Sequence, residues 1–310
     1  GRERQPVAND RLRLGLILPM FSGDAQKVLA AARSSEELGY DGVFAFDHFF
    51  PPGAAPDRPS LEAFSTLGAV AAATSRVRLG TLVTRTVLRP PAMLAKMAAT
   101  LDAMSEGRMI LAVGTGDPID RAEHEAFGFP DLSVPDRRAN LAETIAVLKA
   151  LFSGHVFPGG TRHPRIEGPL LPPSAQPNGP PIWIGAQSDA VVRMAGTVAD
   201  GWNGWALHPD AFHRKVDVLQ DAAAGAGRSV EATWAGIVLV GETEAETERL
   251  HEARLAKNMD AVAWVGPVDR FIEFLHTLRD AGASWAIFVL AGPPGRRELI
   301  AERVLPALAS

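Results

Sequence analysis

Residues 78–116, RLGTLVTRTVLRPPAMLAKMAATLDAMSEGRMILAVGTG, have the order strand, loop, helix, strand. The segments 77–83 and 109–113 are apolar on both faces, as expected for strands that helices cover from outside. Between them, a Pro-Pro pair opens a helix over 92–105, since proline suits the first turn of a helix. Two buried strands joined by one helix run parallel. This stretch therefore predicts part of a parallel sheet.

The helix and the second strand of this stretch also suggest which residues face the core and which face a ligand. Met93, Met97, Leu101 and Met104 follow helical spacing and predict one apolar stripe against the sheet. Gly114-Thr115-Gly116 comes directly after the second strand. Because glycine lets the backbone approach a ligand closely, we expect a binding site at this edge.

Strand-like and helix-like segments alternate along nearly the whole chain, and eight pairs can be counted. This alternation predicts an α/β fold, a (β/α)8 TIM barrel that forms a single domain over 12–310. Two insertions interrupt it, 117–135 after the fourth strand and the proline-rich 153–181 before the fifth, which we expect to be a rigid loop or short hairpin. Residues 1–11 are predicted to be a disordered arm. A doubly wound open sheet is disfavoured because the dinucleotide fingerprint is missing.

Composition excludes several classes of protein. The net charge is −5 without a basic stripe, which argues against nucleic acid as a partner. The apolar runs are too short to span a membrane. Cysteine is absent, which removes disulfides, thiolate metal sites and cysteine nucleophiles. Because the charged start GRERQPVANDRLR argues against a secretory signal, we expect a cytoplasmic protein.

In such a barrel the functional residues lie at the carboxyl ends of the strands. Asp47 and His48 follow the predicted strand 42–46 and must point to opposite sides of it, so one of them faces the mouth. A histidine there can exchange a proton near neutral pH. The alternative is a loop histidine without a functional role, beside an aspartate that caps a helix.

A second candidate site is the segment 185–188, which ends a strand and begins a helix. Its free N–H groups suit a phosphate, although Ser188 could equally be only an N-cap. Trp183, Trp202 and Trp205 lie close to it in the sequence, and core packing accounts for the first two. Glu123-His124-Glu125 lacks the second histidine of a zinc helix, so no metal site is predicted.

Three long segments resemble, in order and spacing, the bacterial luciferase-like flavin oxidoreductase and monooxygenase family. They are ARSSEELGYDGVFAFDHF, the opening stretch 78–116, and PPIWIGAQSDAVVRMAGTVADGWNG. The segment VGPVDRFIEFLHTLRDAGASWAIFVL looks like the last helix and strand of that family. The resemblance spans nearly all of residues 13–290.

The resemblance implies one of two chemistries. One branch of the family takes reduced FMN from a partner reductase and uses dioxygen. The other uses the deazaflavin coenzyme F420 for hydride transfer, and the short chain and the Asp-His pair look more like this branch. The expected function is therefore an F420-dependent oxidoreductase that acts on a small organic, mainly apolar or conjugated substrate, as a homodimer.

Carried over by position, the resemblance makes Asp47 and His48 the catalytic, cofactor-side residues, with His48 the proton donor or acceptor. A non-prolyl cis peptide is expected at Leu82-Val83, behind the cofactor ring. The implied cofactor-binding residues are Leu82, Val83, Thr84, Gly114, Gly116, Asp117, Gly185, Ala186, Gln187 and Ser188. Where F420-dependent relatives commonly have two adjacent glycines, this chain has Gln187-Ser188, which leaves the phosphate contacts open.

The expected substrate contacts are aromatic or apolar side chains near the mouth, walled by the two insertions: Met20, Phe21, Phe49, Phe50 and Trp205. Two alternatives remain, a two-component FMN-dependent monooxygenase and a flavin-binding protein without turnover. A cofactor-free barrel such as an aldolase is disfavoured, because no lysine falls at a predicted strand end.

Overall fold

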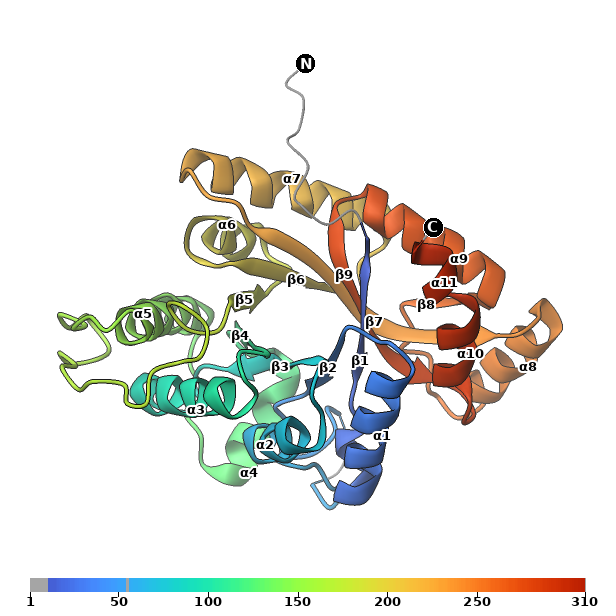
Figure 1. Cartoon of the computed structure of the whole chain (residues 1–310), viewed down its shortest axis with the longest axis horizontal. Helices are drawn as coiled ribbons and strands as arrows, with labels where there is room; N and C mark the ends of the chain where they lie inside the picture. Colours follow the sequence, from blue (N-terminus) through green and yellow to red (C-terminus); the bar gives the residue numbers. More distant parts are fainter. Residues whose placement is uncertain (1–10, 54–55, 310) are drawn as a thin grey trace.

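Eight parallel strands close into a barrel in the computed structural model, which describes residues 11–53 and 56–309 (Figure 1). Neighbours pair in the order β6-β5-β4-β3-β2-β1-β9-β7, and pairing of β6 with β7 closes the ring. The strands are β1 (Arg13–Ile17), β2 (Gly42–Ala45), β3 (Arg78–Arg85), β4 (Met109–Gly114), β5 (Ile182–Gly185), β6 (Gly201–Trp205), β7 (Glu231–Gly241) and β9 (Ala283–Ala291). The predicted (β/α)8 barrel is confirmed. All of the predicted arm except Arg11 lies outside the described residues.

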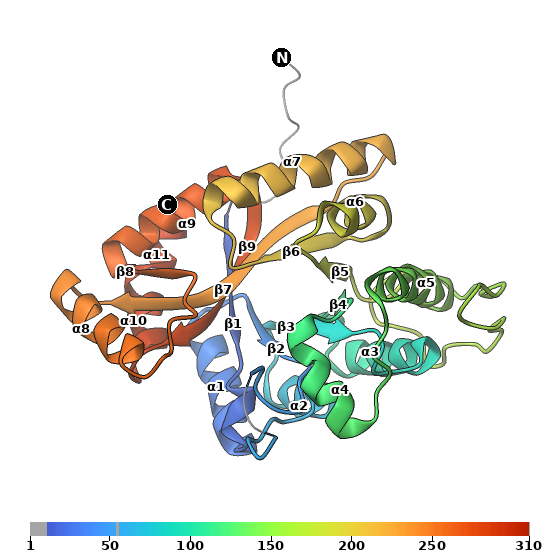
Figure 2. The ribbon, with the colours of Figure 1, turned by 180° about the vertical axis from the view of Figure 1, so that it is seen from behind.

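Helices cover the outside of the barrel (Figures 1 and 2). The helices between β1 and β6 are η1 (Met20–Ser22), α1 (Ala25–Glu37), α2 (Ala63–Ala73), α3 (Pro91–Met104), η2 (Pro118–Asp120), α4 (Arg121–Phe127), α5 (Val134–Phe152) and α6 (Asp189–Val198). The later ones are α7 (Pro209–Gly225), α8 (Glu244–Leu255), α9 (Val268–Asp280), α10 (Arg296–Arg303) and α11 (Leu305–Ala309). Local sequence sets where they begin. Asp24 caps α1 by accepting from the N–H groups of Gln26 and Lys27.

A ninth strand, β8 (Trp264–Pro267), was missed by the sequence analysis. It pairs with residues 238–241 of β7, the half of that strand that β6 does not reach. The strand is only four residues long and runs directly into α9, so its hydrophobic pattern is too short to recognise. The long β7 therefore has two successive neighbours on one edge, first β6 and then β8.

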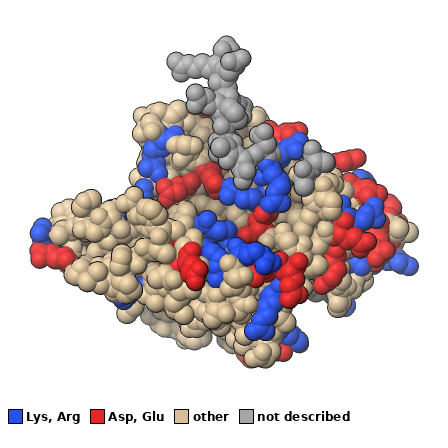
Figure 3. All heavy atoms as spheres, viewed as in Figure 1, with Lys and Arg blue, Asp and Glu red and all other residues tan. Residues whose placement is uncertain are grey.

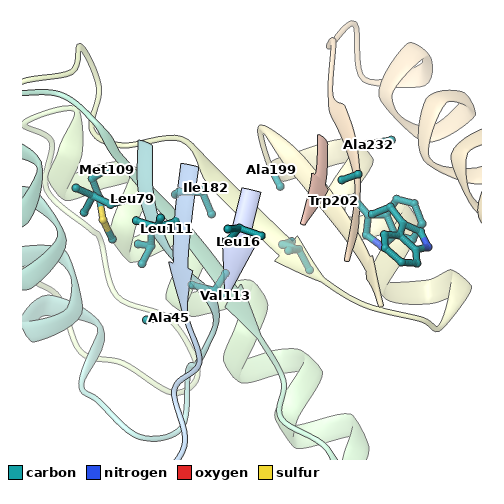
Figure 4. Packing of buried hydrophobic residues seen from close by; sticks show 14 of the residues in the cluster. Leu16, Ala45, Leu79, Met109, Leu111, Val113, Ile182, Ala199, Trp202 and Ala232 are labelled. Carbon is teal, nitrogen blue, oxygen red and sulfur yellow. The ribbon is translucent and has the colours of Figure 1, made fainter. Parts of the chain in front are cut away.

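The core has an outer and an inner part. Outward-pointing strand residues pack under the helices, among them Leu79, Leu111 and Ile182 in Figure 4. A separate cluster contains Phe44, Ile110, Trp183, Trp285 and their neighbours, and these side chains fill the barrel interior. Trp183 and Trp202 are both buried, in agreement with their assignment to core packing.

The predicted apolar stripe on α3 is only partly correct. Met93 and Met104 are 55% and 58% exposed, whereas Leu94, Ala95 and Ala98 are completely buried. The face with small alanine side chains packs inward, because it lets the helix lie close to the neighbouring elements. Of the predicted stripe, Leu101 is buried and Met97 packs against the core, whereas Met93 and Met104 lie on the solvent side.

The two insertions occupy different places. The first contains η2, α4 and the start of α5, and α4 lies in the foreground of Figure 2. The second contains no helix or strand, only an antiparallel bridge between Phe157 and Ile166. Its residues contact α3 and α5 and, through Gln176, the beginnings of β3 and β4. The second insertion therefore does not wall the mouth, contrary to the sequence-based expectation.

Positive and negative side chains are intermixed on the face drawn in Figure 3, without a broad field of either sign. No helix in the described part of the chain is long and apolar enough to cross a membrane.

Candidate functional site at the carboxyl ends of the strands

The end of β2 aims His48 at the barrel mouth. Side chains alternate along a strand, so Phe46 and His48 continue the inward direction of Phe44, which belongs to the interior cluster. The ring of Phe46 lies 6.1 Å from the His48 ring and 5.7 Å from that of Trp205. Phe21 completes the group, 5.7 Å from Phe46 and 6.2 Å from His48. His48 therefore sits in an aromatic surround at the mouth.

Asp47 points the other way and is held by arginines. Its two carboxylate oxygens accept from Arg89 at 2.7 and 2.9 Å, and one also accepts from the N–H of Arg85 at 3.2 Å. The side chain is 3% exposed. We therefore interpret Asp47 as an anchor for the β2 and β3 ends rather than as a catalytic group, because a buried paired carboxylate has no free face for substrate.

A second set of charges lies behind His48 and comes from the first insertion. Glu123 on α4 accepts from His48 Nδ1 at 2.7 Å and from Arg85 Nη2 at 2.6 Å. Asp120 Oδ1 lies 3.7 Å from both His48 Nδ1 and Arg85 Nη1. Burial alone raises the pKa of Glu123, but the hydrogen bonds from His48 and the Phe49 N–H, with the charges of His48 and Arg85, bring it below its ordinary value. Glu123 is therefore ionised at neutral pH.

The same residues have the composition of a metal site. Ligand atoms of His48, Asp120 and Glu123 lie within 4.8 Å of one another, and they form the one such group among the described residues. However, the guanidinium of Arg85 already contacts both carboxylates. Because Arg85 supplies the compensating positive charge, we assign no metal to this group.

Val83, which the family resemblance places behind a cofactor ring, packs against two glycines at the ends of β4 and β5. The Leu82-Val83 peptide bond is cis, as the family resemblance implied. A Cβ atom at Gly114 or at Gly185 would come within 2.7 Å of the Val83 side chain. Both glycines are thus needed to admit Val83, whereas the sequence analysis attributed Gly114 to a close approach of ligand.

Gly116 and Asp117 follow β4 at the rim. Gly116 has a φ of 76°, a left-handed conformation that favours glycine. Partial desolvation, and then the negative charge of Asp120, raise the pKa of Asp117 above its ordinary value, although Arg137 and His48 oppose this. Asp117 is exposed and lies close enough to His48 for their charges to interact.

The predicted phosphate segment 185–188 joins β5 to α6. Gln187 and Ser188 are exposed, and Ser188 is the N-cap of α6 without a side-chain capping bond. The amino end of α6 is therefore open to solvent, as phosphate binding requires. Asp189 in the first turn adds a negative charge there, but Lys215 pairs with it.

The five predicted substrate residues separate into three groups. Phe21 and Trp205 lie at the mouth around Phe46. Met20 and Phe50 are each 1% exposed, so the structure contradicts their assignment as substrate contacts, because packing has used their whole surface. Phe49 packs on Phe127 and Phe129, with ring centroids 4.5 and 5.3 Å apart, and thereby ties the β2 end to α4.

A cavity of about 430 Å³ adjoins Trp205 where β6 leaves β7 and β8 begins. Most of its lining is apolar, and it contains neither lysine nor arginine: Trp205, Ala206, His208, Pro209, Ile237, Ala261, Val262, Ala263, Trp264 and Phe274. The cavity therefore lies next to the aromatic residues Trp205 and Phe46 at the mouth.

Sequence reasoning missed Phe46, Asp120 and Glu123. Phe46 could have been found, because it has the same alternation as His48 along the strand. The carboxylates could not, since Glu123 is 75 residues from His48 and its local pattern, Glu-His-Glu, indicated only an incomplete zinc helix.

Several known proteins are similar to this chain in sequence or in fold. A relative from Nakamurella multipartita, named F420-dependent glucose-6-phosphate dehydrogenase, is 30% identical and covers 89% of this chain and 91% of its own. An F420-dependent secondary alcohol dehydrogenase, solved with an F420-acetone adduct, shares the fold with a TM-score of 0.82, at 20% identity over 96% of this chain and 99% of that one. The monooxygenase RslO1 from Streptomyces bottropensis has a TM-score of 0.76, at 24% identity over 95% and 99% of the two chains.

The sequence profile of one family, described as luciferase-like monooxygenase, matches residues 12–291. That range includes all eight strands of the barrel and every mouth residue described above. The resemblance found in the sequence is thereby confirmed, and the chain belongs to the luciferase-like monooxygenase family.

Proposed function

We propose that this protein is an F420-dependent oxidoreductase that moves a hydride between the coenzyme and a small, uncharged, mainly apolar substrate. The observation that carries the proposal is the placement of His48, an imidazole at the barrel mouth among the rings of Phe21 and Phe46. The names of the relative from Nakamurella multipartita and of the solved alcohol dehydrogenase, both F420-dependent, support the choice of coenzyme.

The residues at the mouth fit a flat ring system with a phosphate-bearing tail. Val83 enters the space that Gly114 and Gly185 leave empty, and so offers an apolar back wall. The exposed amino end of α6 offers unpaired N–H groups to an anion. We propose that Leu82, Val83, Thr84, Gly114, Gly116 and Asp117 would line the ring or its side chain, with 185–188 at the phosphate.

When bound, F420 accepts or supplies a hydride at its central ring. The chain's own contribution is alignment, exclusion of water and transfer of a proton. His48 is bound to Glu123 through Nδ1, which leaves Nε2 for the substrate. If substrate is oxidised, its carbon loses a hydride and Nε2 takes the proton from its hydroxyl group; in the reduction, Nε2 returns that proton to oxygen. A positioned acid or base of this kind typically contributes ~10²–10⁴-fold to the rate.

The apolar cavity beside Trp205 supports the proposed substrate class. A phosphate dianion needs positive partners, and neither lysine nor arginine lines this cavity. Burying an apolar group there is favourable by roughly 25 cal/mol for each Å² removed from water. We therefore propose that the non-reacting part of the substrate occupies this cavity, and that glucose 6-phosphate is a poor substrate.

Fluorescence titrations with oxidised F420 and with FMN test the choice of coenzyme. We expect F420 to bind and FMN to bind much more weakly. Binding of FMN alone would favour the family's oxygen-using chemistry, and binding of F420 without turnover of any alcohol or ketone would favour a carrier protein.

Steady-state assays with a series of secondary alcohols of increasing chain length, and with glucose 6-phosphate, test the substrate class. We expect kcat/KM to rise with apolar length, because a longer chain fills more of the cavity. Preferred turnover of the sugar phosphate would contradict the proposed class while leaving the coenzyme assignment intact.

A further inference from the structure

Glu123 holds His48 through one of its two carboxylate oxygens. Oε1 lies 2.7 Å from His48 Nδ1, and Oε2 accepts from the N–H of Phe49 at 2.8 Å and from Arg85 Nη2 at 2.6 Å. The side chain is 2% exposed, so solvent does not compete for these bonds. Oε2 is therefore engaged by Phe49 and Arg85, and Oε1 binds the imidazole.

The chemistry of this contact determines where the histidine proton lies. An ionised carboxylate accepts hydrogen bonds and donates none, and the Phe49 N–H and the Arg85 guanidinium favour the ionised form of Glu123 independently of His48. A bond of 2.7 Å to Nδ1 therefore requires a proton on Nδ1. In neutral imidazole only one nitrogen carries a proton, so Nε2 must be the acceptor.

The other charged groups near His48 do not compete for this role. Asp120 is 3.7 Å from Nδ1, beyond hydrogen-bond distance, and Asp117 acts on His48 only through its charge. Arg85 faces Glu123 and Asp120 rather than the imidazole. The rings of Phe21 and Phe46 contribute no acceptor. Among the described residues, Glu123 is the one direct hydrogen-bond partner of the imidazole.

We infer that Glu123 is a positioning residue that keeps neutral His48 protonated at Nδ1 and so presents Nε2 to the mouth as a proton acceptor. The catalytic consequence of this inference rests on the proposed function. The tautomer itself does not, since it can be observed in the protein without coenzyme or substrate.

Nitrogen NMR of the protein labelled with ¹⁵N-histidine gives a direct test. Spectra are recorded at alkaline pH, where ordinary histidines are neutral, and His48 is assigned from its absence in His48→Gln. We expect the wild-type imidazole to carry its proton on Nδ1. A proton on Nε2 in the wild type would overturn the inference without any need for a variant.

Glu123→Gln should invert the tautomer. The amide oxygen can keep accepting from Phe49 and Arg85, so the amide nitrogen faces His48 and donates to Nδ1. Nδ1 then becomes the acceptor and Nε2 carries the proton. Glu125→Gln is the matched control, because Glu125 lies on the same helix but is exposed and pairs only with Arg121 at 3.0 Å. An unchanged tautomer in folded Glu123→Gln would refute the inference.

Kinetics separate this inference from the proposed function. If both hold, kcat for Glu123→Gln falls on the order of 10²-fold, with little change in KM or F420 affinity, because only the proton transfer is impaired. An inverted tautomer with unchanged kcat would support the positioning role and refute His48 as the proton carrier. Restored kcat in Glu123→Asp, whose carboxylate is shorter but keeps its charge, would further support it.

Discussion

The two halves of the barrel mouth differ in the kind of side chain they present. The ends of β2, β3 and β4 bring together one imidazole, two guanidiniums and several carboxylates, most of them paired. The region of β6, β7 and β8 presents tryptophans and aliphatic groups around a cavity of about 430 Å³. The polar half, at β2 to β4, holds charged groups in fixed positions, as catalysis requires. The apolar half, at β6 to β8, is suited to recognising a substrate by its shape. The division suggests that changes in the first half alter kcat and stability, whereas changes in the second alter KM.

Removal of His48 should have the largest effect on turnover. We expect His48→Ala to lower kcat by ~10²–10⁴-fold, because the proton at the reacting oxygen then has no positioned acceptor. F420 affinity should stay near the wild-type value in fluorescence titrations. His155→Ala, which alters an exposed histidine far along the chain, is the control. Equal kcat in His48→Ala and wild type would show that the polar half of the mouth does not take part in the reaction.

Removal of Arg85 should chiefly lower stability. Its side chain is 3% exposed and its partners Glu123 and Asp120 are 2% and 5% exposed, so Arg85→Met leaves buried carboxylates without their counter-charge. The expected loss is about 3–5 kcal/mol in the free energy of unfolding, measured by urea denaturation. Arg121→Met, at an arginine that is 69% exposed, should change it by less than about 1 kcal/mol. Similar losses in the two variants would mean that the buried charges are not coupled as described.

The sequence could predict the features of the two halves that depend on residues close together in the chain, but not those that depend on distant residues. The barrel, the inward direction of one member of the Asp47-His48 pair and the place of the cis bond follow from local patterns and family resemblance. The residue pattern left open which member faced inward, and the rings around His48 and the Arg89 clamp on Asp47 decide it. Hydrophobic type alone also failed to distinguish Met20, a core residue, from Phe21 at the mouth.

The charged half was hidden for a further reason. Glu123 reaches His48 only because α4 packs on the β2 end through Phe49 and Phe127, and a contact between separate loops has no periodic pattern in the sequence. The strand β8 was missed likewise, although its pairing with β7 shapes the apolar cavity. Both halves of the mouth therefore depend on long-range packing, even though the strands that carry them were predictable.

A bulky side chain in the apolar half should affect recognition and spare the chemistry. Val262 lines the cavity, and we expect Val262→Trp to raise KM for long-chain substrates about tenfold, a change of about 1.4 kcal/mol, while kcat stays close to wild type. Val156→Trp, at an exposed valine in the second insertion, controls for the added surface tryptophan. A fall in kcat with unchanged KM would show that the two halves are not separate in function.

The smallest expected effect concerns Asp117, at the border of the charged half. Its pKa is raised in the folded protein, so the unfolded chain loses this proton at a lower pH than the folded chain does. Stability is therefore lost as pH rises through the two pKa values, and Asp117→Asn should recover it at neutral pH. The gain should be at most about 1 kcal/mol, since the side chain is exposed and solvent screens the charge. It should vanish well below about pH 4, where aspartate is protonated in both the folded and the unfolded state. Urea denaturation at several pH values measures this gain in stability, and Asp221→Asn, at an exposed aspartate, is the control. A destabilised Asp117→Asn at neutral pH would mean that this carboxylate gains more from Arg137 and His48 than it loses to Asp120, and the charged half would then extend to the rim.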